Sequence, residues 1–339
     1  MQDLTATPSP SVFTERSGKT LIDATRPFAR EDRARSRGAL GSTLAAWALA
    51  TAASASTSLP WTIRLFASLL DALLIVRLFV IYHDFMHGAV LRGSRLSGAL
   101  LRACGVLVMA PPSVWRDTHN YHHAHTAQLI GSNIGSFAMV TTEMWKKMPP
   151  KARVYYRIVR HPLTIVLGYF TIFMLEMCAR SFLRSPRKYW DSGLALALNW
   201  TLTFLILRFA GVAVFLLAFF LPLAVACMLG AYLFYAQHNF PAVRVARREG
   251  WSYAGAALES SSYLPMGPVM AWFTGNIGFH HVHHLNAQIP FYRLPEAMRA
   301  IPELQHPGTT TLNPRDVVRA LSLKLWDHEL GRMVGYPSR

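Results

Sequence analysis

The stretch Gly275-Asn276-Ile277-Gly278-Phe279-His280-His281-Val282-His283-His284 decides the fold and the chemistry that we expect of this chain. His280, His283 and His284 form the pattern H-x-x-H-H. Residues three and four positions apart share one face of a helix, so we expect these imidazoles to converge on one point. Imidazole is the commonest metal ligand among protein side chains, and the pattern predicts a metal site. The alternative is an accidental histidine cluster on a solvated loop.

Related spacings recur elsewhere in the chain, which argues against an accident. A second H-x-x-H-H lies at 119–123, and an H-x-x-x-H lies at 83–87. His238 stands alone after a long apolar segment. A lone histidine is more often structural, but beside the other clusters we expect it to be a ligand. The predicted metal ligands are His83, His87, His119, His122, His123, His238, His280, His283 and His284.

Composition indicates a membrane protein. Of 339 residues, 52% are hydrophobic and 15% are charged, whereas soluble domains carry about 25% charged residues. The net charge of +16 could suggest nucleic-acid binding. However, the basic residues lie in polar segments beside long apolar runs, which favours anionic lipid headgroups and no nucleic acid. Cys104, Cys178 and Cys227 lie far apart in apolar stretches, and we expect buried thiols rather than disulfides.

Two apolar blocks are each long enough for a pair of membrane-spanning helices. Residues 39–82 are broken by Ser-Leu-Pro-Trp at 58–61, and residues 193–235 are broken near 208–211. Each block is about twice the 20 residues that one span needs. Asp71 lies near the middle of a span, a position that suggests either a function or, as we favour, a buried pair with Arg64.

The clusters can share a site only if they lie on one side of the membrane, so an even number of crossings separates them. Residues 162–182 must then dip in and return or lie in the interface, and residues 98–112, which end at Pro111-Pro112, are expected to be interfacial or re-entrant. The basic loop 141–161 would be cytoplasmic. We therefore predict an all-α integral membrane protein: two transmembrane helical hairpins, interfacial helices, and a cytoplasmic helical cap that carries a histidine-rich di-metal site.

The ends of the chain are polar. Residues 1–38 are rich in Pro, Ser and Arg, and we expect a disordered basic cytoplasmic arm without the apolar region of a secretory signal. Asn313-Pro314 is predicted to begin a last helix that reaches about Leu330, followed by a tail at 331–339. Both termini are expected in the cytoplasm, in what we predict to be a bacterial inner membrane.

Nine imidazoles exceed the three or four that one zinc ion takes. They suit two metal ions with four or five nitrogen ligands each. A nitrogen-rich, neutral set favours redox iron, whereas magnesium and calcium prefer oxygen ligands. The E-x-x-H pairs of soluble di-iron carboxylate bundles are not seen in the sequence.

These clusters resemble the membrane fatty acid desaturase family, from roughly Ala39 to Leu330. The resemblance includes His83-Asp84-x-x-His87-Gly88, the 119–123 cluster, and the 275–295 run followed by Glu296-Ala297. Gln237-His238-Asn239-Phe240 is similar to the bacterial acyl-lipid branch. The resemblance implies a desaturase domain at 39–330 that holds two non-haem iron ions. It also implies that dioxygen and external electrons are used to insert a double bond into a fatty acyl lipid or acyl thioester. A separate donor such as a ferredoxin or cytochrome b5 would supply the electrons.

Two positions depart from the family pattern. Phe85-Met86 replaces the Cys-Gly of many relatives, and Phe234 stands where the acyl-CoA branch has an asparagine that helps to hold a metal-bound water. Asn276 is a candidate substitute, with helix capping as the alternative. Residues that could orient the ligands, or could simply be solvated, are Asp84, Asp117, Asn120, His125, Gln237, Asn276 and His281.

Other functions remain open at this stage. The same metal site could serve a hydroxylase, an oxygenase or an oxidative decarboxylase that acts on an acyl, alkane or carotenoid substrate. A histidine-rich metal transporter or membrane haem protein belongs to a different class and would place histidines inside the spans, whereas these spans contain almost none.

Overall fold

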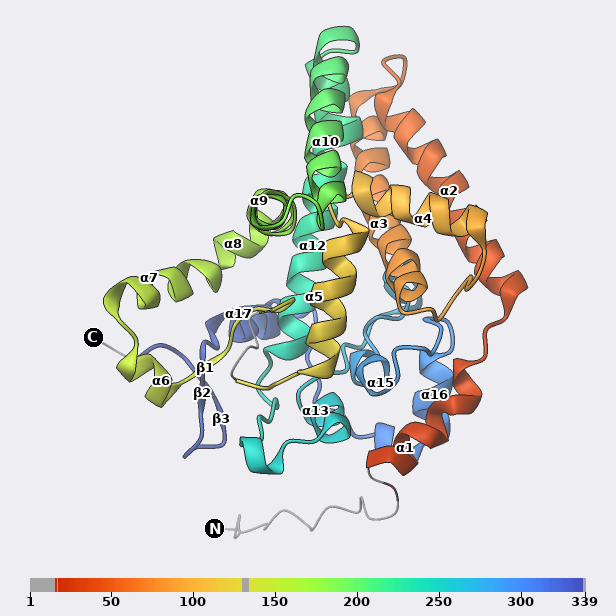
Figure 1. Cartoon of the computed structure of the whole chain (residues 1–339). Coiled ribbons are helices and arrows are strands. Elements are labelled where there is room, and N and C mark those ends of the chain that lie inside the picture. The colour runs from red at the N-terminus through yellow and green to blue at the C-terminus, as the bar shows by residue number, and fades with distance from the viewer. Residues whose placement is uncertain (1–15, 17, 130–133, 338–339) are drawn as a thin grey trace, which may run out of the picture.

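The computed structural model describes residues 16, 18–129 and 134–337. The described chain is mostly helical. Two pairs of long helices rise from a broader region of short helices, loops and a small sheet (Figure 1). Within the described residues, three helices are long and apolar enough to cross a membrane: α3 (Trp61–Met86), α10 (Trp190–Phe209) and the continuous stretch Val212–His238. A mostly helical fold with apolar spans and a histidine cluster is therefore confirmed.

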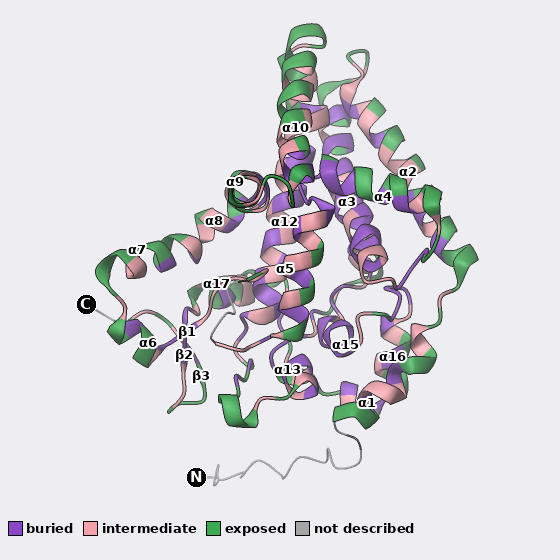
Figure 2. Ribbon diagram, viewed as in Figure 1, coloured by how far each residue is buried: buried purple, intermediate pink, exposed green. Residues whose placement is uncertain are grey.

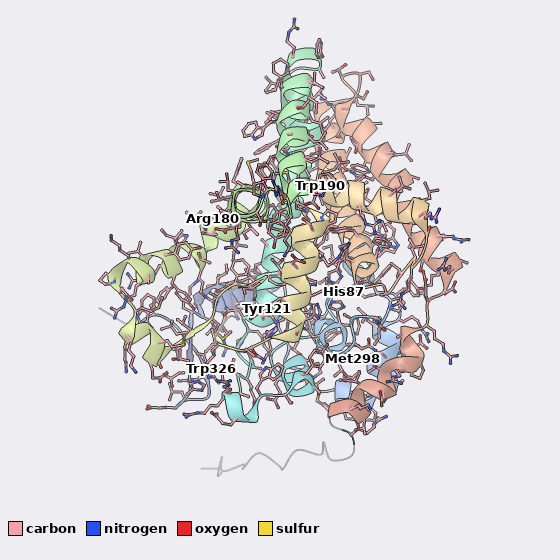
Figure 3. The ribbon with its side chains drawn as sticks, viewed as in Figure 1. His87, Tyr121, Arg180, Trp190, Met298 and Trp326 are labelled. Carbon is pink, nitrogen blue, oxygen red and sulfur yellow. The ribbon has the colours of Figure 1, made fainter. Side chains whose placement is uncertain are left out.

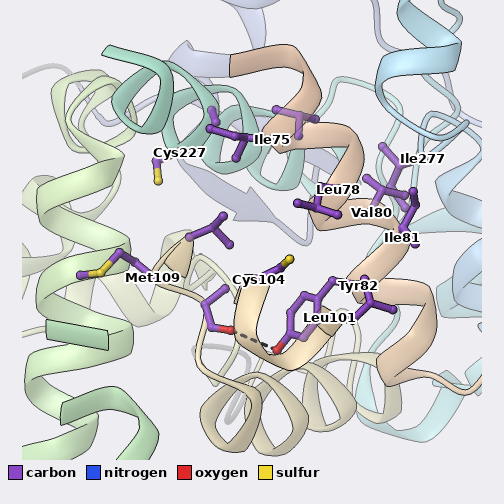
Figure 4. Close-up of a cluster of buried hydrophobic side chains, with 14 of the residues drawn as sticks. Ile75, Leu78, Val80, Ile81, Tyr82, Leu101, Cys104, Met109, Cys227 and Ile277 are labelled. Atoms are coloured by element: carbon purple, nitrogen blue, oxygen red, sulfur yellow. Dashed lines mark hydrogen bonds between the residues drawn. The ribbon is translucent and has the colours of Figure 1, made fainter. Parts of the chain in front are cut away.

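The first pair consists of α2 (Arg33–Ala55) and α3, which pack along each other. Asp32 caps α2 by accepting a hydrogen bond from the Arg35 amide, and Pro60 directly precedes α3. The apolar side chains of α3 pack against α4 (Arg95–Leu107) and α12 (Leu221–His238) in the core that Figure 4 shows. Cys104, Cys178 and Cys227 are buried and free, as predicted.

Polar side chains join this first pair, but not as we predicted. Arg64 and Asp71 are both buried, yet they do not form an ion pair with each other. Arg64 Nε donates to the Ser54 carbonyl at 3.0 Å, and Asp71 accepts from the Thr51 hydroxyl at 3.0 Å. The expected pair was wrong because both side chains reach across to α2 instead of along their own helix.

The second pair consists of α10 and a helix that continues through α11 (Val212–Val214), the π-helical η3 (Phe215–Phe220) and α12. Gly211, with φ of +85°, makes the turn between them. Only 17% of the apolar stretch of α10 is buried, and Figure 2 shows its upper part as exposed. Exposed apolar side chains such as Trp200 and Phe204 suit contact with lipid.

Between the pairs, α4 and α5 (Pro112–Ala124) meet at a bend of 88°. Residues 162–184 form α8 (Pro162–Val166), the π-helical η2 (Tyr169–Arg180) and α9 (Ser181–Arg184). Figure 1 shows α9 end-on whereas α10 lies upright, so this segment runs across the direction of the long helices.

The broader region is built from short elements around the lower ends of the long helices (Figure 1). Its helices are α1 (Gly18–Thr25), η1 (Arg26–Ala29), α6 (Thr142–Lys147), α7 (Pro150–Val159), η4 (Arg248–Gly250), α13 (Tyr253–Glu259), α14 (Pro268–Phe273), α15 (His280–Leu285), α16 (Leu294–Ala300), η5 (Pro302–Leu304) and α17 (Pro314–Ser322). Within the predicted arm 1–38, residues 1–15 and 17 lie outside the described residues. Leu21 of α1 is buried against the cluster that includes Leu285.

A three-stranded sheet was not predicted. β1 (Val140–Thr141) pairs in parallel with β2 (Leu325–Asp327), and β2 pairs antiparallel with β3 (Arg332–Val334). Asn313 caps α17 as expected, but the prediction that this helix reaches Leu330 was wrong. It ends at Ser322 because the next residues pair with distant β1, and Asp327 then accepts hydrogen bonds from the amides of residues 329 and 330 to form a turn.

Gly278 permits a close approach of two backbone segments just before α15. A Cβ at this position would lie 2.2 Å from the Leu264 carbonyl oxygen, and the Gly278 carbonyl accepts from the Leu264 amide at 2.8 Å. Gly278→Ala should therefore lower the free energy of unfolding by about 1–3 kcal/mol, with a fall of several degrees in Tm measured in detergent. Gly267→Ala is the matched control, because its Cβ would meet no atom within 4 Å. Equal Tm values for the two variants would contradict this account.

Candidate metal centre

The nine predicted ligands come from four segments that meet where the long helices reach the broader region. His83 and His87 lie at the end of α3, the 119–123 cluster lies on α5, His238 ends α12, and the 280–284 cluster lies on α15. Figure 3 labels His87 and Tyr121 in this region. Seven of the nine are buried: His83, His119, His122, His123, His280, His283 and His284.

Five of these histidines form one group, called here the five-histidine group: His83, His87, His119, His123 and His283. One ring nitrogen from each lies within 4.8 Å of the others. The Nε2 atoms of His83 and His119 are 2.9 Å apart, and Nε2 of His123 lies 3.1 Å from that of His119 and 3.2 Å from that of His283.

The remaining histidines form a second set, called the four-histidine group: His122, His238, His280 and His284. Nitrogens of His122, His238 and His284 lie within 4.8 Å of one another. His280 completes the set, because its Nε2 lies 3.0 Å from that of His238 and 3.1 Å from that of His284.

The H-x-x-H-H clusters do not each converge on one point, so that expectation was wrong. In the 119–123 cluster, the first and last histidines join the five-histidine group and His122 joins the other group. In the 280–284 cluster, the first and last histidines join the four-histidine group, and His283 joins the first. Positions i and i+4 lie close to one direction around a helix, whereas i+3 and i+4 differ by about 100°. Each cluster therefore contributes to both groups.

The spacing within each group fits metal coordination. Two nitrogens that lie about 2.1 Å from an ion and at right angles to each other are about 3.0 Å apart, and the Nε2 pairs of both groups lie 2.9–3.2 Å apart. The buried Nε2 of His87 has no hydrogen-bond partner among the described residues. A metal ion would complete the bonding of that atom.

Burial keeps the rings neutral. It lowers the pKa of His283 and His284 well below the ordinary histidine value, and the neighbouring histidines lower both values further. A neutral imidazole has a lone pair available for a metal, whereas a protonated one does not.

Three contacts fix which nitrogen of a ring carries the proton. Nδ1 of His83 lies 3.1 Å from the Asp84 carboxylate, and Nδ1 of His238 lies 2.9 Å from the Ser260 carbonyl. Both oxygens can only accept a hydrogen bond, so Nε2 of each ring presents its lone pair to the site. Nδ1 of His284 lies 3.2 Å from the Thr126 hydroxyl, which itself donates to the His122 carbonyl.

Thr126, Ser260 and Trp115 also contact ligands, and none of them was predicted from the sequence. Thr126 follows His122 by four residues and donates to its carbonyl. Trp115 precedes His119 by four residues, and its ring stacks on that of His119 at 4.4 Å. Helical periodicity could have identified both. Ser260 lies in a separate segment, and nothing in its local sequence points to His238.

Among the predicted orienting residues, Asp84 contacts a ligand and three others hold the surrounding backbone. Gln237 Nε2 donates to the Ile277 carbonyl at 2.8 Å, Asn276 Nδ2 donates to the Phe291 carbonyl at 3.1 Å, and His281 Nε2 lies 3.0 Å from the Leu304 carbonyl. These bonds place the segment around α15 relative to α12 and α16. Asn276, with φ of +53°, shapes the turn before α15.

The side chains of the other three predicted orienting residues form no described hydrogen bond with any of the nine histidines. Asp117 pairs with Lys188 at 2.5 Å and accepts from the Tyr189 hydroxyl. Asn120 is exposed. The His125 ring stacks on Tyr121 at 3.9 Å, and its Nδ1 lies 2.9 Å from the Tyr121 carbonyl.

The two departures from the family pattern have structural consequences. The Phe234 ring lies 5.0 Å from that of His122 and 5.6 Å from that of His238, so it covers the four-histidine group with an apolar face. Phe85 turns toward α4, where the Arg102 guanidinium lies over its ring.

Comparison with known proteins gives a consistent result. The profile of the fatty acid desaturase family matches residues 59–315. A "Fatty acid desaturase" of Bacillus subtilis is 29% identical over 83% of this chain and 80% of its own length. An "sn-1 oleoyl-lipid 12-desaturase" of Picosynechococcus sp. is 24% identical over 71% of this chain and 70% of its own. An "sn-1 acyl-lipid omega-3 desaturase (ferredoxin)" of Nostoc sp. is 26% identical over 66% and 63%, respectively. The match across most of the chain, together with the geometry of the nine histidines, establishes that this protein belongs to the fatty acid desaturase family.

Proposed function

We propose that this desaturase holds one iron ion in its five-histidine group and a second in its four-histidine group, and that it acts on the acyl chains of membrane lipids. The convergence of Nε2 atoms into two groups with spacings of 2.9–3.2 Å is the observation that supports two ions. The acyl-lipid substrate is supported by the names of the Picosynechococcus and Nostoc relatives.

The reaction breaks two C–H bonds on adjacent carbons and forms one C=C bond. Dioxygen takes four electrons and becomes two molecules of water. Two electrons come from the C–H bonds and two from an external donor, and two protons come from solvent. Because these C–H bonds have no acidity, bound iron would supply the oxidising chemistry that acid–base side chains cannot supply.

The protein's own residues prepare the site in two ways. Burial keeps the imidazoles neutral, and Asp84, Ser260 and Thr126 hold three rings with Nε2 toward the ions. An aromatic cluster lies between the five-histidine group and the long apolar helices. In it Trp115 stacks on His119, and the Phe79 ring packs edge-on against Trp115 at 4.9 Å. We infer that the acyl chain approaches along this apolar side.

We place both histidine groups at the cytoplasmic rim of a bacterial inner membrane, with both helix pairs inserted as hairpins and both termini in the cytoplasm. The basic loops support this orientation, which requires an even number of crossings between the histidine clusters. Exposed apolar residues of the crosswise segment, such as Leu163 and Leu183, suit a position in the membrane interface. The domain boundaries at 39 and 330 are part of the same proposal.

A separate, acidic redox protein is the expected electron donor. The chain carries a net charge of +16, which favours encounter with an acidic partner. The Nostoc relative has ferredoxin in its name, and we propose a ferredoxin in preference to cytochrome b5.

Loss of one histidine ligand of the metal should abolish formation of the double bond. A host that expresses the wild-type chain should gain a double bond at unchanged acyl chain length, measured by fatty-acid profiling. His283→Ala should give no such product and should lower the iron content of the purified protein, because His283 belongs to the five-histidine group. His328→Ala, in the turn region after β2, is the control and should match wild type. An oxygenated or shortened wild-type product would instead favour a hydroxylase or a decarboxylase.

The Asp84 carboxylate should matter for iron retention. It contacts Nδ1 of His83 at 3.1 Å and accepts from the Phe291 amide at 2.7 Å. Asp84→Asn weakens the acceptor for the ring N–H, and iron affinity measured by competition with a chelator should fall by about 10–100-fold. Asp117→Asn changes the same functional group at the surface and should leave affinity unaltered. Similar losses in both variants would refute the orienting role of Asp84.

A further inference from the structure

A surface hollow of about 150 Å³ is lined in part by Ser260, whose carbonyl contacts His238 of the four-histidine group. Residues of the segment 244–252 and of α13 form its wall, and Ala127 and the buried Ser260 also line it. Figure 1 shows α13 at the lower edge of the molecule, away from the tips of the long helices. In the proposed orientation, this surface faces the cytoplasm.

Two hydrogen-bonded connections run from this hollow to metal ligands. Trp251 Nε1 donates to the Thr126 carbonyl at 2.9 Å, and the Thr126 hydroxyl lies 3.2 Å from Nδ1 of His284. In the second connection, the Ser260 hydroxyl donates to the Arg244 carbonyl, and the Ser260 carbonyl lies 2.9 Å from Nδ1 of His238. Each connection reaches a different histidine of the four-histidine group. Only one residue separates the surface segment from the ligand in each case.

The segment 244–251 is basic, and its three arginines are exposed. It contains Arg244, Arg247 and Arg248 against one acid, Glu249, and a second acid, Glu259, lines the hollow. None of the three arginine side chains forms an ion pair with a described residue. Arg244 lines the hollow, and Arg247 and Arg248 are exposed on the same segment. Exposed arginines without an ion-pair partner can bind carboxylates of a partner protein.

We propose that the segment 244–251 and its hollow form the docking surface for the acidic ferredoxin, and that electrons pass through Thr126 and Ser260 to the four-histidine group. This inference rests on the proposed function, since it requires iron at that group. The donor is oxidised and delivers, one at a time, the two electrons that dioxygen needs beyond those from the C–H bonds.

Binding tests the surface directly. The iron-loaded protein in detergent is titrated with an acidic [2Fe–2S] ferredoxin at low ionic strength, and Kd is measured by calorimetry. The double variant Arg247→Glu, Arg248→Glu should raise Kd by about tenfold or more, and added salt should weaken wild-type binding. The matched control, Lys146→Glu with Lys147→Glu, makes the same charge change at two exposed residues of α6 and should alter Kd much less. Equal effects, or no wild-type binding, would overturn the proposal.

Electron transfer tests the connections separately from docking. Trp251→Phe keeps an aromatic ring but removes the N–H that bonds to Thr126. Ferredoxin Kd should stay unchanged, while anaerobic stopped-flow should show several-fold slower oxidation of reduced ferredoxin by the variant. An unchanged rate would exclude the Trp251 connection.

A chemical reductant separates failure of this proposal from failure of the function. Dithionite bypasses the docking surface, so single-turnover double-bond formation with dithionite should be the same in wild type and in all these variants. If the wild type forms no double bond with dithionite, the proposed function is wrong. If dithionite supports product formation but the arginine variant binds ferredoxin as tightly as wild type, only the docking surface is wrong.

Discussion

The structure depends on one geometric constraint: nitrogen atoms from four distant segments must converge in two groups, with neighbouring Nε2 atoms about 3 Å apart. Protonated rings would repel one another at this spacing, so the rings have to be neutral, and a metal ion between them would need a lone pair from each ring turned inward. Burial supplies the first condition by lowering the pKa of residues such as His283. Acceptors that cannot donate supply the second, as the Ser260 carbonyl does for His238.

Contacts of the surrounding backbone hold these four segments in position relative to one another. Asp84 joins the end of α3 to the Phe291 amide, and Gln237 joins the end of α12 to the Ile277 carbonyl. Gly278 allows the chain before α15 to lie directly against Leu264. Each connection lies within a few residues of a ligand. A small displacement of α15 would therefore move ligands of both groups together, because this helix contributes to each.

The histidine residues could be predicted from their spacing, but their division between two groups could not. An H-x-x-H-H pattern shows which side chains share a helical face, and it was natural to expect one point of convergence. Because the histidines divide between two groups, however, the rotation of about 100° between positions i+3 and i+4 of a helix places His122 and His123 in different groups. Contacts between residues far apart in the chain could not be predicted from local sequence patterns. The Arg64–Asp71 pair and the helix expected to reach Leu330 were both inferred from neighbours along the chain. In the structure, their partners come from α2 and β1.

The two histidine groups have different neighbours: aromatic side chains border one group, and polar residues border the other. Trp115 and Phe79 border the five-histidine group on the side of the apolar helices. Thr126 and Ser260 border the four-histidine group on the side of the basic segment 244–251. Under the proposed function, a lipid chain would approach on the first side and a water-soluble donor on the second. The helices α5 and α15 each contribute ligands to both histidine groups. These two helices therefore hold the two groups at a fixed distance from each other.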